Sequence, residues 1–244
     1  MRVLALAGGE KRVRFVRVLK ERLALRSLQP ISREVLRDNL TYLSTEKLRR
    51  IERAVQSTRL VPGDIVEFGV ALGGSAIIMA TSKGASRRFI GFDVFSMIPP
   101  PTSEKDDAHS LERYEIIKSG QSTGIGGDEY YGYRSDLLSD VKQAFERHRV
   151  PVDGKDIRLV EGLFEETWKP ANVGVISLAH IDCDWYDPVK FCLNAICEKL
   201  NPGGIIVLDD YHDYGGCRTA VDEFREVRTD FEFQDGANPY LTKL

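Results

Sequence analysis

The spacing of apolar residues predicts strands that alternate with helices along most of the chain. Short apolar runs with strand character alternate with stretches in which apolar residues recur at helical spacing. The expected strands are residues 65–68, 88–92, 157–160, 173–181, 205–208, 231–233 and 240–244. The last two look like a terminal antiparallel pair. Alternating strands and helices predict an α/β fold, a doubly wound and mainly parallel sheet.

Helices are expected between most of these strands. Ser44 is the expected N-cap of a helix with Glu46 in its first turn, and another helix begins near Ser75. The remaining expected helices cover residues 11–26, 111–117, 137–145 and 188–200, with a last one after 215–216. Residues 96–134 are polar and rich in Pro, Gly and Tyr, and such a long insertion predicts a lid or binding loop. Residues 1–60 are interpreted as an N-terminal helical extension and 61–244 as the main domain.

Charge separates these two parts of the chain. The whole chain of 244 residues has a net charge of −3, which argues for neither a nucleic-acid nor a membrane partner. Residues 1–60, however, contain 15 Lys and Arg against 6 Asp and Glu. A solvated helical surface is the commonest outcome of such a charge run. The alternatives are that this segment faces an anionic ligand or a partner subunit, as in a homo-oligomer formed through the N-terminal helices.

The spacing of the cysteines and the nature of the N-terminal residues suggest an intracellular protein. The four cysteines form no CxxC pair, and the histidines lack the spacing of a zinc site. The apolar start, residues 3–7, is too short for a signal-peptide core, and no run approaches the length of a membrane span. We therefore expect reduced thiols and a cytoplasmic location.

A glycine-rich turn follows the first expected strand, from Glu67 through Gly69, Gly73 and Gly74 to Ser75. Glycines let the backbone turn sharply and approach a ligand, while the helix N-terminus offers unpaired N–H groups. The spacing differs from the dinucleotide fingerprint GxGxxG and from a Walker A loop. An acid before such a turn favours a nucleoside with a cationic or zwitterionic tail, such as S-adenosylmethionine. A plain tight turn is the alternative.

Two residues after the neighbouring strands extend this expected pocket. Asp93 ends its strand at the position from which a carboxylate can accept hydrogen bonds from both ribose hydroxyls. An Asp that only caps a turn is the alternative. Gly162 follows the next strand, where the adenine would pass.

Acidic residues collect at the ends of two later strands. Asp182 closes one strand, and Asp209 with Asp210 closes the next. Three converging carboxylates would repel one another by roughly 4 kcal/mol per close pair at an effective dielectric near 20. A divalent cation relieves this repulsion, and short acids suit Mg²⁺ or Ca²⁺ better than zinc. Asp184, expected to point away, and Asp187, expected to cap the next helix, are weaker ligand candidates. Ordinary loop acids are the alternative reading of the triad.

Five segments, in order, resemble the macrocin O-methyltransferase family. They are EFGVALGGS, GFDVF, HIDCDWYDP, GGIIVLDDY and GCRTAVDEF, in a similarity that spans residues 43–244. Each segment is weakly specific, but the ordered set is highly specific. The resemblance implies a class I methyltransferase sheet of seven strands, parallel except for a final antiparallel strand. It also implies Mg²⁺-dependent methyl transfer from S-adenosylmethionine to a sugar hydroxyl.

The resemblance also implies site residues. The family's metal ligands carry over onto Asp182, Asp209 and Asp210. Its cofactor contacts carry over onto Glu67, Gly69, Gly73, Ser75 and Asp93. The chain departs from the family's usual residues at Ala71-Leu72 and at residues 94–97, where it reads VFSM. These departures leave the acceptor open among a sugar nucleotide, a glycosylated small molecule and a glycan terminus.

Methylation of a sugar hydroxyl needs a group that accepts its proton, because the hydroxyl is almost fully protonated at neutral pH. Asp182, His109 in the insertion and His212 beside the acids are the candidates. Two other functions stay open. Asp182-x-Asp184 resembles the DxD of a metal-dependent glycosyltransferase, and a non-catalytic binding module is the third possibility.

Overall fold

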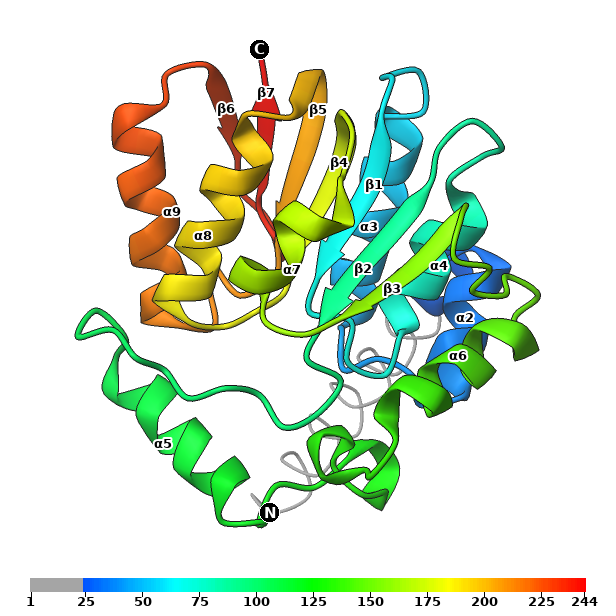
Figure 1. Cartoon of the computed structure of the whole chain (residues 1–244), viewed down its shortest axis with the longest axis vertical. Coiled ribbons are helices and arrows are strands. Elements are labelled where there is room, and N and C mark those ends of the chain that lie inside the picture. Colours follow the sequence, from blue (N-terminus) through cyan, green and yellow to red (C-terminus); the bar gives the residue numbers. More distant parts are fainter. Residues whose placement is uncertain (1–23) are drawn as a thin grey trace, which may run out of the picture.

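Seven strands form one mixed sheet in the computed structural model, which describes residues 24–244 (Figure 1). Their order across the sheet is β3-β2-β1-β4-β5-β7-β6. The strands are β1 (Asp64–Phe68), β2 (Phe89–Asp93), β3 (Ile157–Glu161), β4 (Ile176–Ile181), β5 (Leu200–Leu208), β6 (Phe231–Gln234) and β7 (Tyr240–Lys243). β1 to β5 pair in parallel, and β7 pairs antiparallel with both β5 and β6. The predicted fold class and the terminal antiparallel pair are confirmed.

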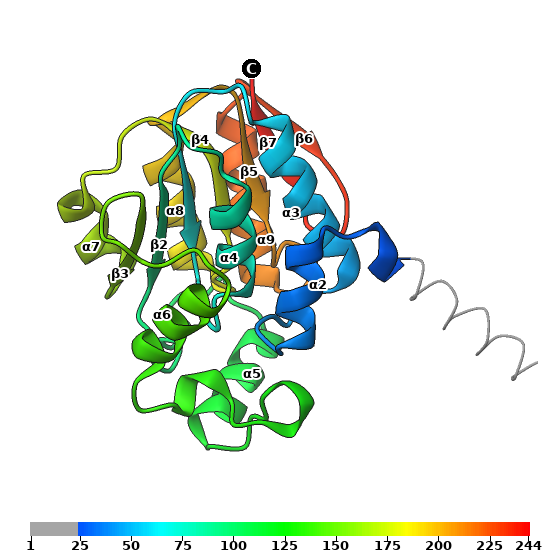
Figure 2. The same cartoon turned by 90° about the vertical axis from the view of Figure 1, so that its right-hand side faces the viewer.

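Helices cover both faces of this sheet (Figures 1 and 2). The labelled helices are α2 (Pro30–Arg37), α3 (Thr45–Ser57), α4 (Gly74–Ser82), α5 (Ala108–Lys118), α6 (Leu137–Arg147), α7 (Phe164–Ala171), α8 (Tyr186–Cys197) and α9 (Gly215–Val227), of which α5 lies below the sheet and covers neither face (Figure 1). Apolar side chains of α2, α3, α4 and α6 pack on one face, and those of α7, α8 and α9 pack on the other. Because α2 and α3 share a core with the sheet, the predicted extension is packed on the main domain from residue 28 onward. The division at residue 60 stays a prediction.

Most expected helices are present, and two were not predicted. Ser44 accepts a hydrogen bond from the N–H of Lys47 at 3.3 Å, which confirms it as the N-cap of α3. The short helices α2 and α7 escaped notice, since each has only eight residues and α7 contains Pro170. The expected helix over residues 11–26 lies, apart from its last three residues, outside the described residues. The proposed oligomer contact through it therefore stays a prediction.

Strand β5 begins earlier than residue 205, the start that the sequence predicts. Its pairing with β4 runs from Leu200 opposite Ile176 to Ile205 opposite Leu178, so the register shifts between these pairs. The Asn-Pro-Gly-Gly segment is therefore an irregular part of the strand, where a helix end and a loop are expected.

Parallel pairing brings the carboxyl ends of β1, β2, β4 and β5 to one edge of the sheet. The strand order reverses between β1 and β4, and this point of reversal is where open α/β sheets bind ligands. At Gly69, just after β1, the backbone has φ +92°, and a Cβ there would overlap the carbonyl oxygen of Asp182 after β4. Glycine at this position therefore lets the two strand ends lie in contact.

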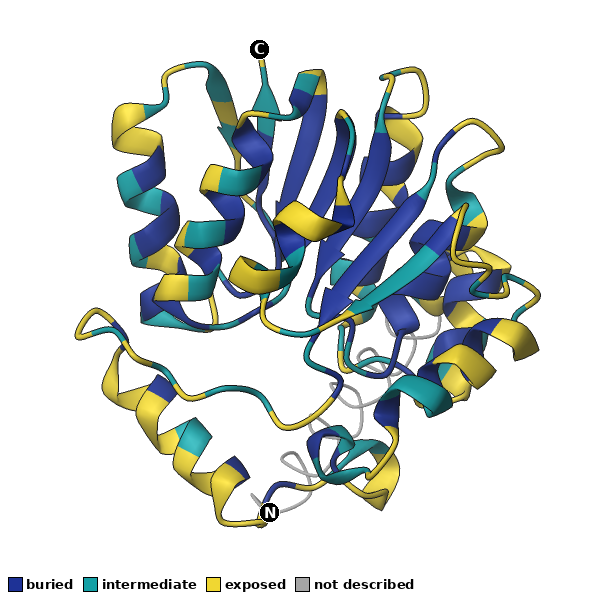
Figure 3. Ribbon diagram, viewed as in Figure 1, coloured by how far each residue is buried: buried dark blue, intermediate teal, exposed yellow. Residues whose placement is uncertain are grey.

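The insertion lies below the carboxyl edge of the sheet, and its helix α5 is largely exposed (Figures 1 and 3). The insertion is tied to the starts of α8 and α9. Asp106 accepts a hydrogen bond from the N–H of Tyr186 at 2.8 Å, and Asp107 accepts one from the N–H of Gly215 at 2.9 Å. Asp187, the expected cap of α8, lies inside its first turn and accepts a hydrogen bond from Thr102 instead. The side-chain cap of α8 therefore comes from the insertion, because Asp106 accepts a hydrogen bond from the first N–H group of this helix, that of Tyr186.

Asp106→Ala should lower the free energy of unfolding by about 1 kcal/mol, the usual effect of removing a helix cap. Asp106 is 8% exposed, so water cannot easily replace the lost acceptor. Urea unfolding of the variant and of Glu104→Ala, an exposed neighbour, measures the difference. Equal stability of the two variants would contradict the capping role.

Candidate active site

A cavity of about 650 Å³ opens at the carboxyl edge of the sheet. Its walls are the glycine-rich turn after β1, the loops after β2, β4 and β5, the start of α7, and part of the insertion. This volume lies in the range of sites that bind small molecules and cofactors. The cavity lies where the sequence predicts the ligand site.

Only some of the residues predicted to contact the cofactor from the glycine-rich turn line the cavity. Gly69, Gly74 and Ser75 line it. Gly73 has φ +88° and is the N-cap of α4, so its role is to turn the chain into the helix. Glu67 is fully buried beneath the turn. Among the described residues, its carboxylate therefore affects the site only indirectly, through the residues with which it is in contact.

Where the sequence predicts contacts with the adenine, the residues that line the cavity differ from the predicted one. Gly162 is not among the described residues that line the cavity, whereas Leu163, Phe164 and Glu165 are. Gly162 has φ +131°, a conformation that favours glycine, and it leads the chain from β3 into α7. The side chains that could contact a base are those that follow Gly162, and its own contact with the cofactor stays a prediction.

A buried polar chain connects the glycine-rich turn with the acids after β5. His180 on β4 lies between Glu67 and Asp209. Its Nδ1 is 2.8 Å from Glu67 Oε1, and its Nε2 is 3.7 Å from Asp209 Oδ1. Lys47 on α3 continues the chain, with its Nζ 2.7 Å from Asp209 Oδ2. Glu67 Oε2 is buried without a partner among the described residues.

The shifted pKa values indicate how charge is distributed among these buried polar side chains. Burial opposes the charged form of His180, but the nearby carboxylates of Asp209 and Glu67 raise its pKa to about 10. Burial alone would raise the pKa of Asp209, yet His180 and Lys47 lower it. Burial raises the pKa of Glu67. Asp209 is therefore an anion balanced by two cations.

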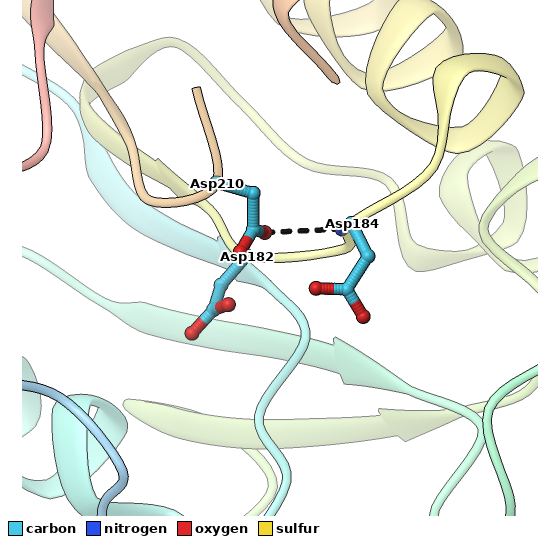
Figure 4. Close-up of side chains that lie close together, drawn as sticks. All are labelled: Asp182, Asp184 and Asp210. Carbon is cyan, nitrogen blue, oxygen red and sulfur yellow. Dashed lines mark hydrogen bonds between the residues drawn. The ribbon is translucent and has the colours of Figure 1, made fainter. Parts of the chain in front are cut away.

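Three carboxylates meet beside this chain (Figure 4). Asp182 and Asp184 follow β4 and Asp210 follows β5, and each contributes an oxygen to a group whose atoms lie within 4.8 Å of one another. The N–H of Asp184 donates to Asp210 Oδ2 at 3.0 Å. The expectation that Asp184 points away is wrong, because its left-handed backbone, φ +58°, turns the side chain toward the other two acids.

Asp209, an expected metal ligand, forms contacts with other side chains. Besides its ion pair with Lys47, it belongs to a second group of oxygens with Asp210 and Asp213. Lys47 also forms an ion pair with Asp213 at 2.7 Å, so the ammonium group of Lys47 already lies among these acids. The structure thus offers two overlapping sets of acids, and both contain Asp210.

The group of Asp182, Asp184 and Asp210 fits a divalent cation. In residues 24–244, none of the three forms an ion pair with Lys, Arg or His within 4.0 Å. Burial and then neighbouring carboxylates raise the pKa of Asp182 and of Asp210, and burial raises that of Asp184 to about 6. A hard cation would remove this repulsion, and three carboxylate oxygens are the ligand type that Mg²⁺ prefers.

The two histidine candidates lie away from the cavity. His212 is exposed, and its Nε2 is 2.8 Å from Asp235 Oδ1. His109 is exposed, and its ring stacks on that of Tyr214 with centroids 5.5 Å apart. Neither is among the described residues that line the cavity. The geometry therefore favours the carboxylates over these histidines as proton acceptors.

Part of the cavity lining, here called the aromatic wall, consists of aromatic side chains. It includes the rings of Tyr42, Tyr130, Trp185 and Tyr214, and the guanidinium-bearing Arg113 of α5 also lines the cavity. Trp185 Nε1 donates to the carbonyl of Pro99 at 3.0 Å, which fixes this ring against the insertion. Aromatic faces bind the C–H-rich faces of organic ligands well.

Two residues of the site, His180 and Lys47, were not predicted from the sequence, and a third, Asp184, was predicted only as a weaker ligand candidate. Asp184 stands two positions after Asp182, a spacing that could have indicated a shared face. His180 stands two positions before Asp182 but lies within a buried strand, where its type signals nothing specific. Lys47 is 162 residues away from Asp209, and only the folded chain brings the two together.

Comparison with known proteins adds a family and a fold. The model of the family described as Macrocin-O-methyltransferase (TylF) matches residues 32–232. The 8-demethyl-8-(2,3-dimethoxy-alpha-L-rhamnosyl)-tetracenomycin-C 4'-O-methyltransferase of Streptomyces olivaceus is 29% identical over 191 residues, covering 76% of this chain and 67% of the relative. Mycinamicin III 3''-O-methyltransferase of Micromonospora griseorubida is 27% identical over 195 residues, covering 76% and 70%.

Solved structures resemble the fold. The O-methyltransferase NovP superimposes with a TM-score of 0.69 at 23% identity, covering 84% of this chain and 82% of that one. The calicheamicin methyltransferase CalS11 superimposes with a TM-score of 0.59 at 22% identity, covering 92% and 90%. At these identities the likeness concerns the fold alone.

Proposed function

Since the chain belongs to the macrocin-O-methyltransferase family and is an O-methyltransferase, we propose that it transfers a methyl group from S-adenosylmethionine to a sugar hydroxyl with the help of Mg²⁺. One observation carries this proposal: a single cavity joins the glycine-rich turn after β1 to the carboxylates after β4 and β5. Donor and acceptor chemistry can therefore meet in one place. Neither a glycosyltransferase nor a non-catalytic module is supported by the family match.

The donor would lie against the glycine-rich turn. Gly69 and Gly74 line the cavity and let neighbouring segments of the protein pack closely against this turn, and Ser75 lies in the first turn of α4. Leu163 and Phe164 offer apolar surface for an adenine ring. This arrangement fits a nucleoside with a polar tail.

The acceptor would lie between the acids and the aromatic wall. The tetracenomycin relative acts on a compound that carries a rhamnosyl group, as its name states, and the name of the other relative gives mycinamicin III as its substrate. Tyr42, Tyr130, Trp185 and Tyr214 would pack against an acceptor of this kind. A glycoside with an apolar aglycone is therefore the acceptor class that we propose.

Asp182, Asp184 and Asp210 would hold the Mg²⁺ ion, and Asp209 would be kept in place beside them by Lys47 and His180. A bound ion of this kind acts as a Lewis acid on an acceptor hydroxyl. The proton of that hydroxyl would pass to Asp182, the candidate acceptor that lies in the carboxylate group. The enzyme's own residues then orient the donor and hold the proton, while the aromatic wall excludes water.

Treatment with EDTA should abolish methyl transfer, and added Mg²⁺ should restore it. Mass spectrometry of reactions with a panel of rhamnosides and deoxysugar nucleotides measures turnover and identifies the acceptor. Calorimetric titration with S-adenosylhomocysteine, UDP and dTDP in parallel tests the donor pocket. Full methyl transfer in EDTA would contradict the metal role, and binding of the diphosphates alone would contradict the proposed donor.

A further inference from the structure

Two basic side chains of residues 24–244 line the cavity, those of Lys47 and Arg113. The ammonium group of Lys47 is already paired with Asp209 and Asp213, at 2.7 Å from each. Within the same described range, the guanidinium of Arg113 forms no hydrogen bond and no ion pair within 4.0 Å. Arg113 is therefore the basic residue of the cavity whose charge remains available to a ligand.

The guanidinium of Arg113 lies among rings of the aromatic wall. Its Cζ is 5.7 Å from the centroid of the Tyr130 ring, a distance at which a cation and an aromatic face attract each other. Burial raises the pKa values of Tyr42 and Tyr214, and the charge of Arg113 acts on both in the opposite direction. These three rings come from the insertion, the loop before α3 and the start of α9. The side chain of Arg113 thus faces the cavity, although most of α5 is exposed (Figure 3).

The charges of the proposed reactants do not require Arg113 as a counterion. The group of Asp182, Asp184 and Asp210 carries three negative charges when it is fully ionised. Mg²⁺ and the sulfonium group of the donor would together offset these charges. Arg113 is therefore not needed to neutralise the acids once metal and donor are bound, and its charge can serve the acceptor.

We propose that Arg113 is a specificity-determining residue that binds an anionic oxygen group of the acceptor, outside the sugar that is methylated. The proposal rests on the proposed function, because it places that sugar at the carboxylates. A guanidinium binds carboxylate and phosphate oxygens through two parallel N–H donors, so it selects such groups by geometry as well as by charge.

Two kinds of acceptor carry an anionic oxygen group of this type. A glycoside can carry a carboxylate on its aglycone, and a sugar nucleotide carries a diphosphate. The rings of Tyr42, Tyr130 and Tyr214 favour the aglycone, because they would pack on its apolar part while the guanidinium binds its carboxylate.

Calorimetry in the presence of S-adenosylhomocysteine and Mg²⁺ tests this assignment with 4-carboxyphenyl α-L-rhamnoside, its methyl ester and dTDP-rhamnose. The parent protein should bind the carboxylate about tenfold more tightly than the ester, the usual effect of one charged hydrogen-bonding pair. Arg113→Gln should lose this preference. Arg113→Lys should keep part of it, because the charge remains without the planar fork. Lys118→Gln, which removes a charge from an exposed position of the same helix, should keep all of it.

Tighter binding of dTDP-rhamnose than of the carboxylate, lost in Arg113→Gln, would identify the diphosphate as the anion that Arg113 binds. Equal affinity of the parent protein for all three probes would overturn the proposal, and so would an unchanged preference in Arg113→Gln. S-adenosylhomocysteine should bind the parent protein and Arg113→Gln equally, which shows that the variant is folded. Failure of the parent protein to bind S-adenosylhomocysteine would instead contradict the proposed function.

Discussion

Asp210→Asn should lower kcat for methyl transfer by about 10³-fold or more while S-adenosylhomocysteine still binds, because a metal ion contributes several kcal/mol to such a reaction. Asp210 belongs to both groups of acids that could hold a cation. Asparagine keeps the shape of the side chain but removes its charge. The N–H of Asp184 can still donate to the amide oxygen, so the fold should be retained. Mass-spectrometric turnover assays and calorimetry measure the two effects separately.

Two matched variants decide which group of acids holds the ion. Asp184→Asn removes a charge from the group with Asp182, and Asp213→Asn removes one from the group with Asp209. We expect Asp184→Asn to lose most of its turnover and Asp213→Asn to keep it, since the side chain of Asp213 is 52% exposed and paired with Lys47. The reverse result would move the ion to Asp209, Asp210 and Asp213. Full activity of all three variants would refute a catalytic cation at this edge of the sheet.

His180→Leu should lower the free energy of unfolding by about 3–5 kcal/mol, the usual effect of removing one partner of a buried pair. The ring of His180 and the carboxylate of Glu67 are both fully buried. Without the ring, Glu67 keeps no charged partner among the residues that the structure describes, and Asp209 loses one of its two cations. Urea unfolding monitored by circular dichroism measures the change.

The double variant Glu67→Leu/His180→Leu provides the control. When both partners become apolar, no buried charge is left alone, and much of the stability should return. Together with Glu67→Leu and the parent protein, these variants form a double-mutant cycle that isolates the interaction between the two side chains. Equal stability of His180→Leu and the parent protein would contradict a structural role for the pair.

The sequence predicts the sheet edge and its acids well because both follow from local patterns. Each parallel strand appears as a short apolar run, and the residues after it must meet at one edge. Asp182 and Asp210 are therefore found without any knowledge of the fold. The resemblance to the family then supplies the methyl donor, a conclusion that the apolar pattern alone cannot reach.

Side-chain partners could not be predicted, because they depend on loop conformations that no pattern encodes. Asp93 and Asp184 show this most clearly. Asp93 was placed correctly at the end of β2, but the left-handed backbones of Ala71 and Phe95 aim their N–H groups at its carboxylate. Asp184 was set aside, yet its own left-handed backbone directs it toward Asp182 and Asp210. Non-glycine residues with positive φ thus explain why these side-chain contacts could not be predicted from the sequence.

The contacts of Asp106 and Asp107 define a segment that protein engineers could exchange. Both acids are bonded to the starts of core helices, and Asp136 caps α6 at the other end. Residues 108–135 lie between these fixed points and include Arg113 and Tyr130 of the cavity wall. A chimera that replaces only this segment would keep the cap of α8 and the carboxylates that precede it. The acceptor range of one family member could then be grafted onto the methyl-transfer machinery of another.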